Sequence, residues 1–431
     1  MGTRKSARLA AVCIGAATFV AAVPVLCAEL QQVGSQEAAD MEDAFETTAQ
    51  QTIPGYHNVI ELNTLFQMAL GKNVIEDAAD DKVVRLKNGM LTFVCDSADV
   101  TDSINGILNL KKVCDENDTQ LLYIQAPQKI SKFDPELPAG VQDYGNEIAD
   151  SFLQGIDGKI PYIDLREKIY DAGINQYDLF FKTDHHWTAE GAFWCWGKVA
   201  QTLKSDYGFA FDDKITNMDS YTVKTYPDWF LGSQGKRVGT VYAGVDDFSV
   251  ITPNYETNFD FTVPDKDIER HGSYADTLLV KDAYETKDYY NGNPYAAYIG
   301  GDYALNHIVN KLAPNDKKVL LVRDSFACAF TPFLAQSCAQ LDTIDMRAFQ
   351  GTIAQYIVES KPDIVLFLYN TSALPGAANF RSRTIGKNPR ETILWQLPLS
   401  TTASSMTLST ATPARPTFCW LTVRLPLSAA G

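Results

Sequence analysis

Short apolar runs that alternate with helix-like segments restrict most strongly how this chain can fold. Runs such as QLLYIQAP (120–127), KKVLLV (317–322) and PDIVLFLY (362–369) are apolar at successive positions, so both faces of each strand must be buried. Further strands are predicted at 160–165 and 341–346, and helices at 103–117, 145–155, 189–208, 331–340 and 350–359. Strands separated by helices predict an α/β fold with a doubly wound parallel sheet.

Two segments depart from this rhythm. KVVRLKNGMLTFV (82–94) alternates apolar and polar residues around Asn88-Gly89, which predicts a β-hairpin. From about 212 to 300 the chain is aromatic, Asp-rich and Gly-rich with short β patterns, which predicts a β-rich insertion in the sheet domain.

The first 28 residues predict export from the cytoplasm. Three basic residues within the first eight positions precede an uncharged apolar stretch at 9–28, typical of a signal peptide and also long enough for a signal anchor. The protein is therefore expected to be extracytoplasmic, either secreted or held at the membrane by its N-terminal segment. The predicted organisation is a signal at 1–28, a polar spacer at 29–59, sheet-domain parts at 60–211 and 301–378 around the insertion at 212–300, and an atypical, disordered tail at 379–431.

Charge and cysteine content exclude several functions. The chain of 431 residues carries 53 acidic and 37 basic side chains, a net charge of −16, which argues against binding to nucleic acid or to an anionic membrane surface. Its eight cysteines show neither a CxxC pair nor Cys/His ligand spacing, so no structural metal site is expected.

KTDHHWT (182–188) concentrates polar residues before a helix that Thr188 would cap. In an extended segment Asp184 and His186 point the same way, so the carboxylate can hold the imidazole in one tautomer, as a hydrolase requires. A metal site formed by Asp184, His185 and His186 is the less favoured reading, because adjacent side chains diverge and no other histidine has ligand spacing. An isolated D-x-H is also compatible with a polar turn before a helix.

Ser325 in KKVLLVRDSFACAF is the best candidate nucleophile. It follows a buried strand, at the carboxyl end where α/β proteins bind ligands, although an ordinary Asp/Ser turn would give the same pattern. Ser233 in FLGSQG competes less well, because Leu231 takes the first glycine position of G-x-S-x-G. GSQGKRVG (232–239) is instead expected to be a loop that lines the site, and it lacks the spacing of a phosphate-binding loop.

Several motifs in order resemble a known family. KTDHHWT, WFLGSQGKRVGTVYAGVDDF, VRDSFACAFTPFLA and IDMR are similar to the DHHW proteins, relatives of the alginate O-acetylation proteins AlgJ and AlgX in the SGNH-hydrolase superfamily. The resemblance covers about residues 60 to 375. It implies that Ser325 is the nucleophile, His186 the general base and Asp184 its orienting acid, in a motif order permuted from ordinary SGNH esterases.

The resemblance also implies a pocket and a reaction. Arg347 and Tyr369 would flank the pocket, and Asn370 would donate to the oxyanion. The expected activity is O-acetyl transfer or acetyl-ester hydrolysis on a cell-surface or exported polysaccharide through an acyl-enzyme. A membrane-bound acyltransferase is the expected partner, and no cofactor is required.

A different class of function uses the same fold. A non-catalytic carbohydrate-binding or assembly protein of a polysaccharide acetylation system could stack sugars on the aromatic side chains of YPDWF (226–230) and DYYNGNPYAAY (288–298). An intact set of Asp184, His186 and Ser325 favours the enzyme, because a binding protein does not need all three.

Overall fold

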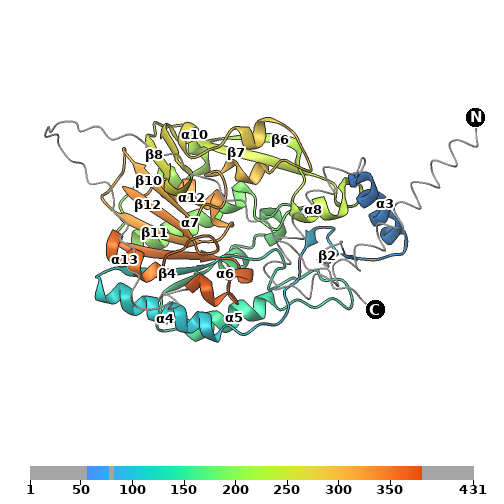
Figure 1. Ribbon diagram of the computed structural model, residues 1–431, viewed down its shortest axis with the longest axis horizontal. Helices are drawn as coiled ribbons and strands as arrows, with labels where there is room; N and C mark the ends of the chain where they lie inside the picture. Colours follow the sequence, from blue (N-terminus) through green and yellow to red (C-terminus); the bar gives the residue numbers. More distant parts are fainter. Residues whose placement is uncertain (1–55, 77–81, 381–431) are drawn as a thin grey trace, which may run out of the picture. The chain divides into compact units, whose positions relative to one another are not determined.

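The computed structural model describes residues 56–76 and 82–380, and an eight-stranded sheet forms its centre (Figure 1). The strands of this sheet are β4 (Gln120–Gln125), β5 (Tyr162–Asp164), β8 (Phe259–Val263), β9 (Ile268–Gly272), β10 (Leu305–Asn310), β11 (Lys318–Arg323), β12 (Gln340–Asp345) and β13 (Ile364–Tyr369). Their order is β5-β4-β13-β11-β12-β10-β8-β9. The first five are mutually parallel, and β10, β8 and β9 continue the sheet in antiparallel pairing.

Helices cover both faces of the parallel strands. Helices α4 (Thr101–Glu116), α5 (Gly145–Ile156) and α13 (Ile353–Ser360) lie on one face, and α7 (Ala189–Asp206) and α12 (Ala327–Ala335) on the other. Successive strand residues point to opposite faces, so Leu121 and Tyr123 pack with the first group while Leu122 and Ile124 pack with the second. The α/β fold expected from the apolar runs is confirmed as a mixed sheet with a parallel centre.

The predicted elements of this centre agree closely with the observed ones. The strands predicted at 120–127, 317–322, 341–346 and 362–369 correspond to β4, β11, β12 and β13. Thr188 caps α7 as expected, because its hydroxyl accepts a hydrogen bond from the Gly191 N–H. Helix α12 begins earlier than the pattern at 331–340 indicated, and β10 was not predicted.

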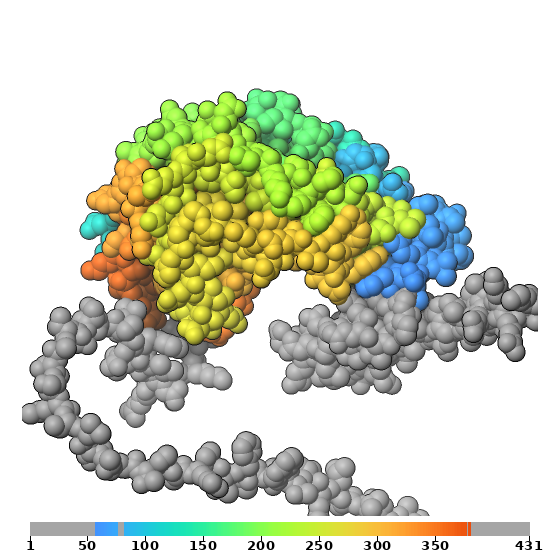
Figure 2. All heavy atoms as spheres, turned by 90° about the horizontal axis from the view of Figure 1, so that it is seen from above, coloured from blue at the N-terminus to red at the C-terminus, as the bar shows by residue number. Residues whose placement is uncertain are grey.

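Segment 212–300 contributes to two sheets. β6 (Tyr221–Phe230) and β7 (Asp246–Pro253) form a two-stranded antiparallel ribbon, whereas β8 and β9 pair with the edge of the central sheet. Two short helices, α8 (Ser233–Val238) and α9 (Thr240–Ala243), connect β6 to β7. In the space-filling view, residues of this segment cover much of the face turned toward the reader (Figure 2).

A small sheet and a helix precede the central domain. β1 (Val74–Glu76), β2 (Lys82–Arg85) and β3 (Leu91–Thr92) form an antiparallel sheet, and Gly89 adopts a φ of 86° in the predicted hairpin turn. Helix α3 (Tyr56–Ala69) contacts α9 through Glu61, which accepts hydrogen bonds from the Thr240 backbone and side chain.

The predicted signal or anchor at 1–28 and nearly all of the predicted tail lie outside the described residues. Among the residues that are described, no helix is both long and apolar enough to cross a membrane. Residues 379 and 380 are described and end a short 3-10 helix, Ala377–Phe380, in which the Phe380 ring is buried against Phe152 of α5.

Candidate active site

Asp184, His186 and Ser325 meet at the carboxyl edge of the parallel strands. Ser325 lies two residues after β11, and the other two lie in the segment that leads into α7. His186 Nδ1 is 2.6 Å from Asp184 Oδ1, and His186 Nε2 is 2.8 Å from Ser325 Oγ. Because a carboxylate only accepts hydrogen bonds, Nδ1 carries the proton and Nε2 is left to accept from the serine hydroxyl.

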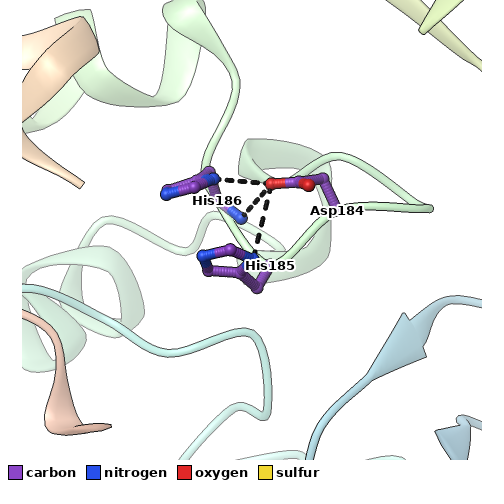
Figure 3. A group of neighbouring side chains, drawn as sticks. All are labelled: Asp184, His185 and His186. Carbon is purple, nitrogen blue, oxygen red and sulfur yellow. Dashed lines mark hydrogen bonds and ion pairs between the residues drawn. The ribbon is translucent and has the colours of Figure 1, made fainter. Parts of the chain in front are cut away.

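The segment around Asp184 is a closed turn, which explains why residues two apart face each other. Phe180 and Trp187 form an isolated antiparallel bridge, and the Phe181 N–H donates to the His186 carbonyl at 3.2 Å. Asp184 Oδ1 also accepts the His186 backbone N–H at 3.0 Å. Figure 3 shows Asp184 contacting both imidazoles from the tip of this turn.

Gly232 and Ser233, at the start of α8, support Asp184 from its other side. Segment 232–239 was expected to be a loop, but residues 233–238 form this short helix. Asp184 Oδ2 accepts the Ser233 backbone N–H at 2.7 Å. A Cβ added at Gly232 would lie 2.2 Å from the Asp184 Cβ, so only glycine permits this approach. Burial alone would raise the pKa of the Asp184 carboxyl, but its contacts with the imidazoles and the Ser233 N–H hold that pKa well below its usual range. The group is therefore a buried carboxylate.

Asp246, the first residue of β7, fixes the residues before Asp184. Its carboxylate accepts the backbone N–H groups of Lys182 and Thr183 at 2.6 and 2.8 Å and the Thr183 hydroxyl at 2.5 Å. The Thr183 hydroxyl accepts the Gly232 N–H at 2.8 Å. Segment 212–300 thus holds the turn around Asp184 at two points, the first residue of β7 and the start of α8.

Aromatic side chains fix the distance between His186 and Ser325. The His186 ring stacks on Tyr295 with centroids 4.0 Å apart and an angle of 14°. The Tyr295 hydroxyl and the Trp187 indole N–H both donate to the Phe326 carbonyl, at 3.0 and 2.8 Å. Because Trp187 and Phe326 are the residues that follow His186 and Ser325, these two hydrogen bonds hold the segments of His186 and Ser325 together.

His185 has a separate environment. Its Nδ1 is 3.0 Å from the Ser233 hydroxyl, and its ring lies 3.8 Å from that of His186. Burial and the neighbouring His186 lower the pKa of His185, so its imidazole is neutral at ordinary pH. Asp184, His185 and His186 place one potential ligand atom each within 4.8 Å of one another. Both His186 nitrogens are already hydrogen-bonded, so a metal ion would have to displace Asp184 or Ser325.

A cavity of about 170 Å³ opens beside Ser325. It is lined by His185, Arg323, Asp324, Ser325, Phe326, Asp345, Arg347, Tyr369, Ser372, Ala373 and Asn379. Arg347 and Tyr369 line this cavity, and their part in binding a substrate stays a prediction. The Asn370 side-chain amide donates to the Pro127 carbonyl at 3.2 Å and does not line the cavity, so its oxyanion role stays a prediction.

Arg323, the last residue of β11, lines the cavity but was not identified from the sequence as part of the site. Arg323 is fully buried and pairs with Asp302 at 2.9 Å. Arg347 is half-exposed and pairs with Asp302 at 2.9 Å and with Asp345 at 2.5 Å.

Asp324, directly before Ser325, was likewise not identified. It is buried and accepts the backbone N–H groups of Phe326 and Asn370 at 2.9 and 2.7 Å. Burial raises the pKa of its carboxyl to about 6.

The chain with this mixed α/β sheet is similar to SGNH hydrolase-like proteins. The family model "SGNH hydrolase-like domain, acetyltransferase AlgX" matches residues 90–224. Within this class the chain is similar to the DHHW proteins, whose family model matches residues 166–342 and so includes Asp184, His186 and Ser325. The resemblance seen in KTDHHWT and VRDSFACAFTPFLA is confirmed.

Two solved structures share the fold at low sequence identity. Bacillus cereus PatB1 is 22% identical with a TM-score of 0.59, over 69% of this chain and 98% of its own. A DHHW family protein from Eubacterium siraeum DSM 15702 is 16% identical with a TM-score of 0.55, over 71% of this chain and 96% of its own. The O-acetyltransferase domain of Pseudomonas putida AlgJ is 13% identical with a TM-score of 0.41, over 72% of this chain and 96% of its own. A search of curated proteins found no match.

Proposed function

We propose that the protein is an SGNH-type O-acetyltransferase or acetylesterase in which Ser325, His186 and Asp184 form a catalytic triad. One observation carries the proposal: the His186 ring is 2.8 Å from the Ser325 hydroxyl through Nε2 and 2.6 Å from the Asp184 carboxylate through Nδ1. This is the arrangement that activates a serine nucleophile. The matched AlgX model and the AlgJ domain are described as acetyltransferases, which supports the acetyl group as the transferred unit.

The reaction follows from these contacts. Ser325 Oγ attacks the carbonyl carbon of an acetyl ester while its proton passes to His186 Nε2, and Asp184 stabilises the imidazolium that results. When the tetrahedral intermediate collapses, the ester C–O bond breaks and the leaving alcohol takes the proton from His186. The acetyl-enzyme then reacts with water or a sugar hydroxyl, whose proton His186 accepts and returns to Ser325.

The proposed acceptor is a cell-surface or exported polysaccharide. The predicted N-terminal signal supports an extracytoplasmic reaction, and the resemblance to the alginate O-acetylation proteins supports a membrane-bound acyltransferase as the source of the acetyl group. Arg347 supports a polar acceptor, because its half-exposed guanidinium lines the cavity beside Ser325.

An assay with 4-nitrophenyl acetate tests the proposal. Ser325→Ala and His186→Ala should each lose nearly all activity, whereas Ser372→Ala, which changes a serine of the same cavity that has no contact with His186, should retain it. Mass spectrometry should find an acetyl group on Ser325 after rapid quenching. Equal activity in all four proteins would instead favour the carbohydrate-binding alternative. Adding acetyl-free oligosaccharides and measuring their acetylation would separate transfer from hydrolysis.

A further inference from the structure

Lys129 is a buried lysine beneath the site, in the segment after β4. Only 3% of its surface is exposed. Among the residues that the structure describes, its ammonium makes no ion pair with a carboxylate; all its hydrogen bonds go to neutral oxygens. Burying an ammonium that has no carboxylate partner costs free energy of folding. We therefore expect the hydrogen bonds of Lys129 to have a role in the folded protein.

The three acceptors come from three different segments. Lys129 Nζ donates to the Leu91 carbonyl of β3 at 2.6 Å, to Gln234 Oε1 of α8 at 3.0 Å and to the Lys182 carbonyl at 3.2 Å. An ammonium has three N–H groups, so each acceptor can receive one. A neutral amine has two N–H groups and a lone pair, which would face one acceptor and repel it.

Two of these acceptors belong to residues that lie next in sequence to the groups holding Asp184 in position. Lys182 lies two residues before Asp184 in the closed turn, and Gln234 follows Ser233, whose N–H binds the Asp184 carboxylate. Leu91 reinforces the same junction, because its own N–H donates to the Lys182 carbonyl at 2.9 Å. Lys129 therefore links two segments that flank Asp184, the turn at Lys182 and the start of α8, to the small sheet of β1, β2 and β3.

We propose that Lys129 is a positioning residue for the reaction proposed above: its protonated ammonium holds Asp184 in place for His186, and loss of one proton releases this support. The inference rests on the proposed function, because it concerns the orientation of the proposed general base. Lys129 touches neither Ser325 nor the cavity beside it.

Burial brings deprotonation of Lys129 into an accessible pH range. Burial lowers the pKa of Lys129 to about 7, although the Asp184 and Asp246 carboxylates act in the opposite direction. His185 is the other titratable group that faces this charge, and it is neutral for the reasons given above. The three-bond arrangement should thus be complete in mild acid and incomplete in mild alkali.

Steady-state kinetics of Lys129→Met and Lys129→Arg with 4-nitrophenyl acetate test the inference. Lys129→Met should lower kcat ten- to hundredfold with KM changed less than about twofold, because acyl transfer and not substrate contact is affected. Lys129→Arg, which keeps a permanent cation, should recover part of kcat. Lys132→Met is the matched control: Lys132 pairs at the surface with Asp150 and Glu167, and its loss should leave kcat unchanged.

The pH profile distinguishes positioning from a merely structural role. Wild-type kcat should fall on the alkaline side with the same midpoint as the ¹⁵N-detected titration of Lys129 Nζ, and this fall should be absent in Lys129→Met. A wild-type kcat that stays level through that midpoint would overturn the inference, even if both variants fail to fold.

The experiments distinguish a failure of the proposed catalytic function from a failure of the role proposed for Lys129. If Ser325→Ala keeps full activity, the proposed function falls, and the positioning role is then judged by the ¹⁵N shifts of the His186 imidazole. Those shifts should differ between wild type and Lys129→Met at the same pH. Identical shifts in the folded variant would exclude a role for Lys129 in placing Asp184 against His186.

Discussion

The backbone N–H of Ser233, the first residue of α8, donates to Asp184 Oδ2 at 2.7 Å from 49 positions further along the chain. The other carboxylate oxygen accepts a hydrogen bond from His186 Nδ1, so both oxygens of Asp184 are fixed by protein contacts. The orientation of His186, the proposed base, therefore depends on the start of α8, which contributes no side chain to the proposed triad.

Substituting Gly232 with Ala should misplace Asp184. The new Cβ would lie 2.2 Å from the Asp184 Cβ and 2.5 Å from its Cα, so the loop or the turn must move. We expect kcat for 4-nitrophenyl acetate to fall more than tenfold and the unfolding free energy to drop by about 1–3 kcal/mol. Gly197→Ala in α7 is the control: its Cβ meets nothing within 4 Å, and a helix gains up to about 1 kcal/mol from the exchange. Similar kinetics in both variants would argue against the contact.

Asp184→Asn should abolish most activity with the fold retained. The amide can present its NH₂ group to His186 Nδ1, which would stabilise the tautomer that cannot accept the Ser325 proton. In a serine triad the corresponding exchange lowers kcat on the order of 10⁴-fold. Asp171→Asn, at the exposed end of helix α6 (Leu165–Asp171), should be silent in the same assay. Near-normal kcat in Asp184→Asn would exclude its orienting role.

Arg323→Met should destabilise the protein strongly. The guanidinium is fully buried, 2.9 Å from Asp302 and 3.9 Å from the buried Asp345, and its removal takes away one of the two arginines that pair with these carboxylates. Breaking a buried pair costs about 3–5 kcal/mol, which urea denaturation measures. Lys281→Met removes an exposed partner of Asp276, and we expect a loss below about 1 kcal/mol. If both variants lost equally little, Arg323 would not balance those charges.

The Asp324 carboxyl should make stability depend on pH. Burial raises its pKa from 3.8 to about 6, so the folded state holds a proton that the unfolded state has released between these values. The stabilisation is complete below pH 3.8 and is lost as the pH rises through about 6, a contribution of roughly 2–3 kcal/mol.

Urea denaturation of wild type and Asp324→Asn across this range isolates that contribution. The variant will be less stable at every pH, because one of the two N–H groups bound by Asp324 loses its acceptor. The informative quantity is the difference between the two proteins, which should shrink as the pH rises. A constant difference would mean that Asp324 is ionised in the folded protein throughout.

The parallel strands and the three central side chains could be predicted from the sequence for a physical reason. A strand buried on both faces must be apolar at every position, and the polar residues that end it, as at Ser325, are then conspicuous. LNHIVN of β10 was missed because alternation over a few residues near the sheet edge gives a weak signal.

Contacts between distant segments gave no local signal. Arg323 and Asp324 look like surface turn residues, yet both are buried, one by pairing with Asp302 and the other by accepting two backbone N–H groups. Gly232 looks like a flexible loop residue, whereas its role is to make room for Asp184. The burial of Lys129 likewise depends on three segments that are distant in the sequence, so it could not be predicted from the residues around it.

β13 is the last strand of the central sheet in the sequence. This strand follows Asp184, His186 and Ser325 in the chain, yet it lies between β4 and β11 and pairs with both. A nascent chain that has not reached residue 364 already carries all three side chains but has a gap in the middle of its sheet. The strand that completes the middle of the sheet is therefore synthesised after all three side chains of the proposed triad.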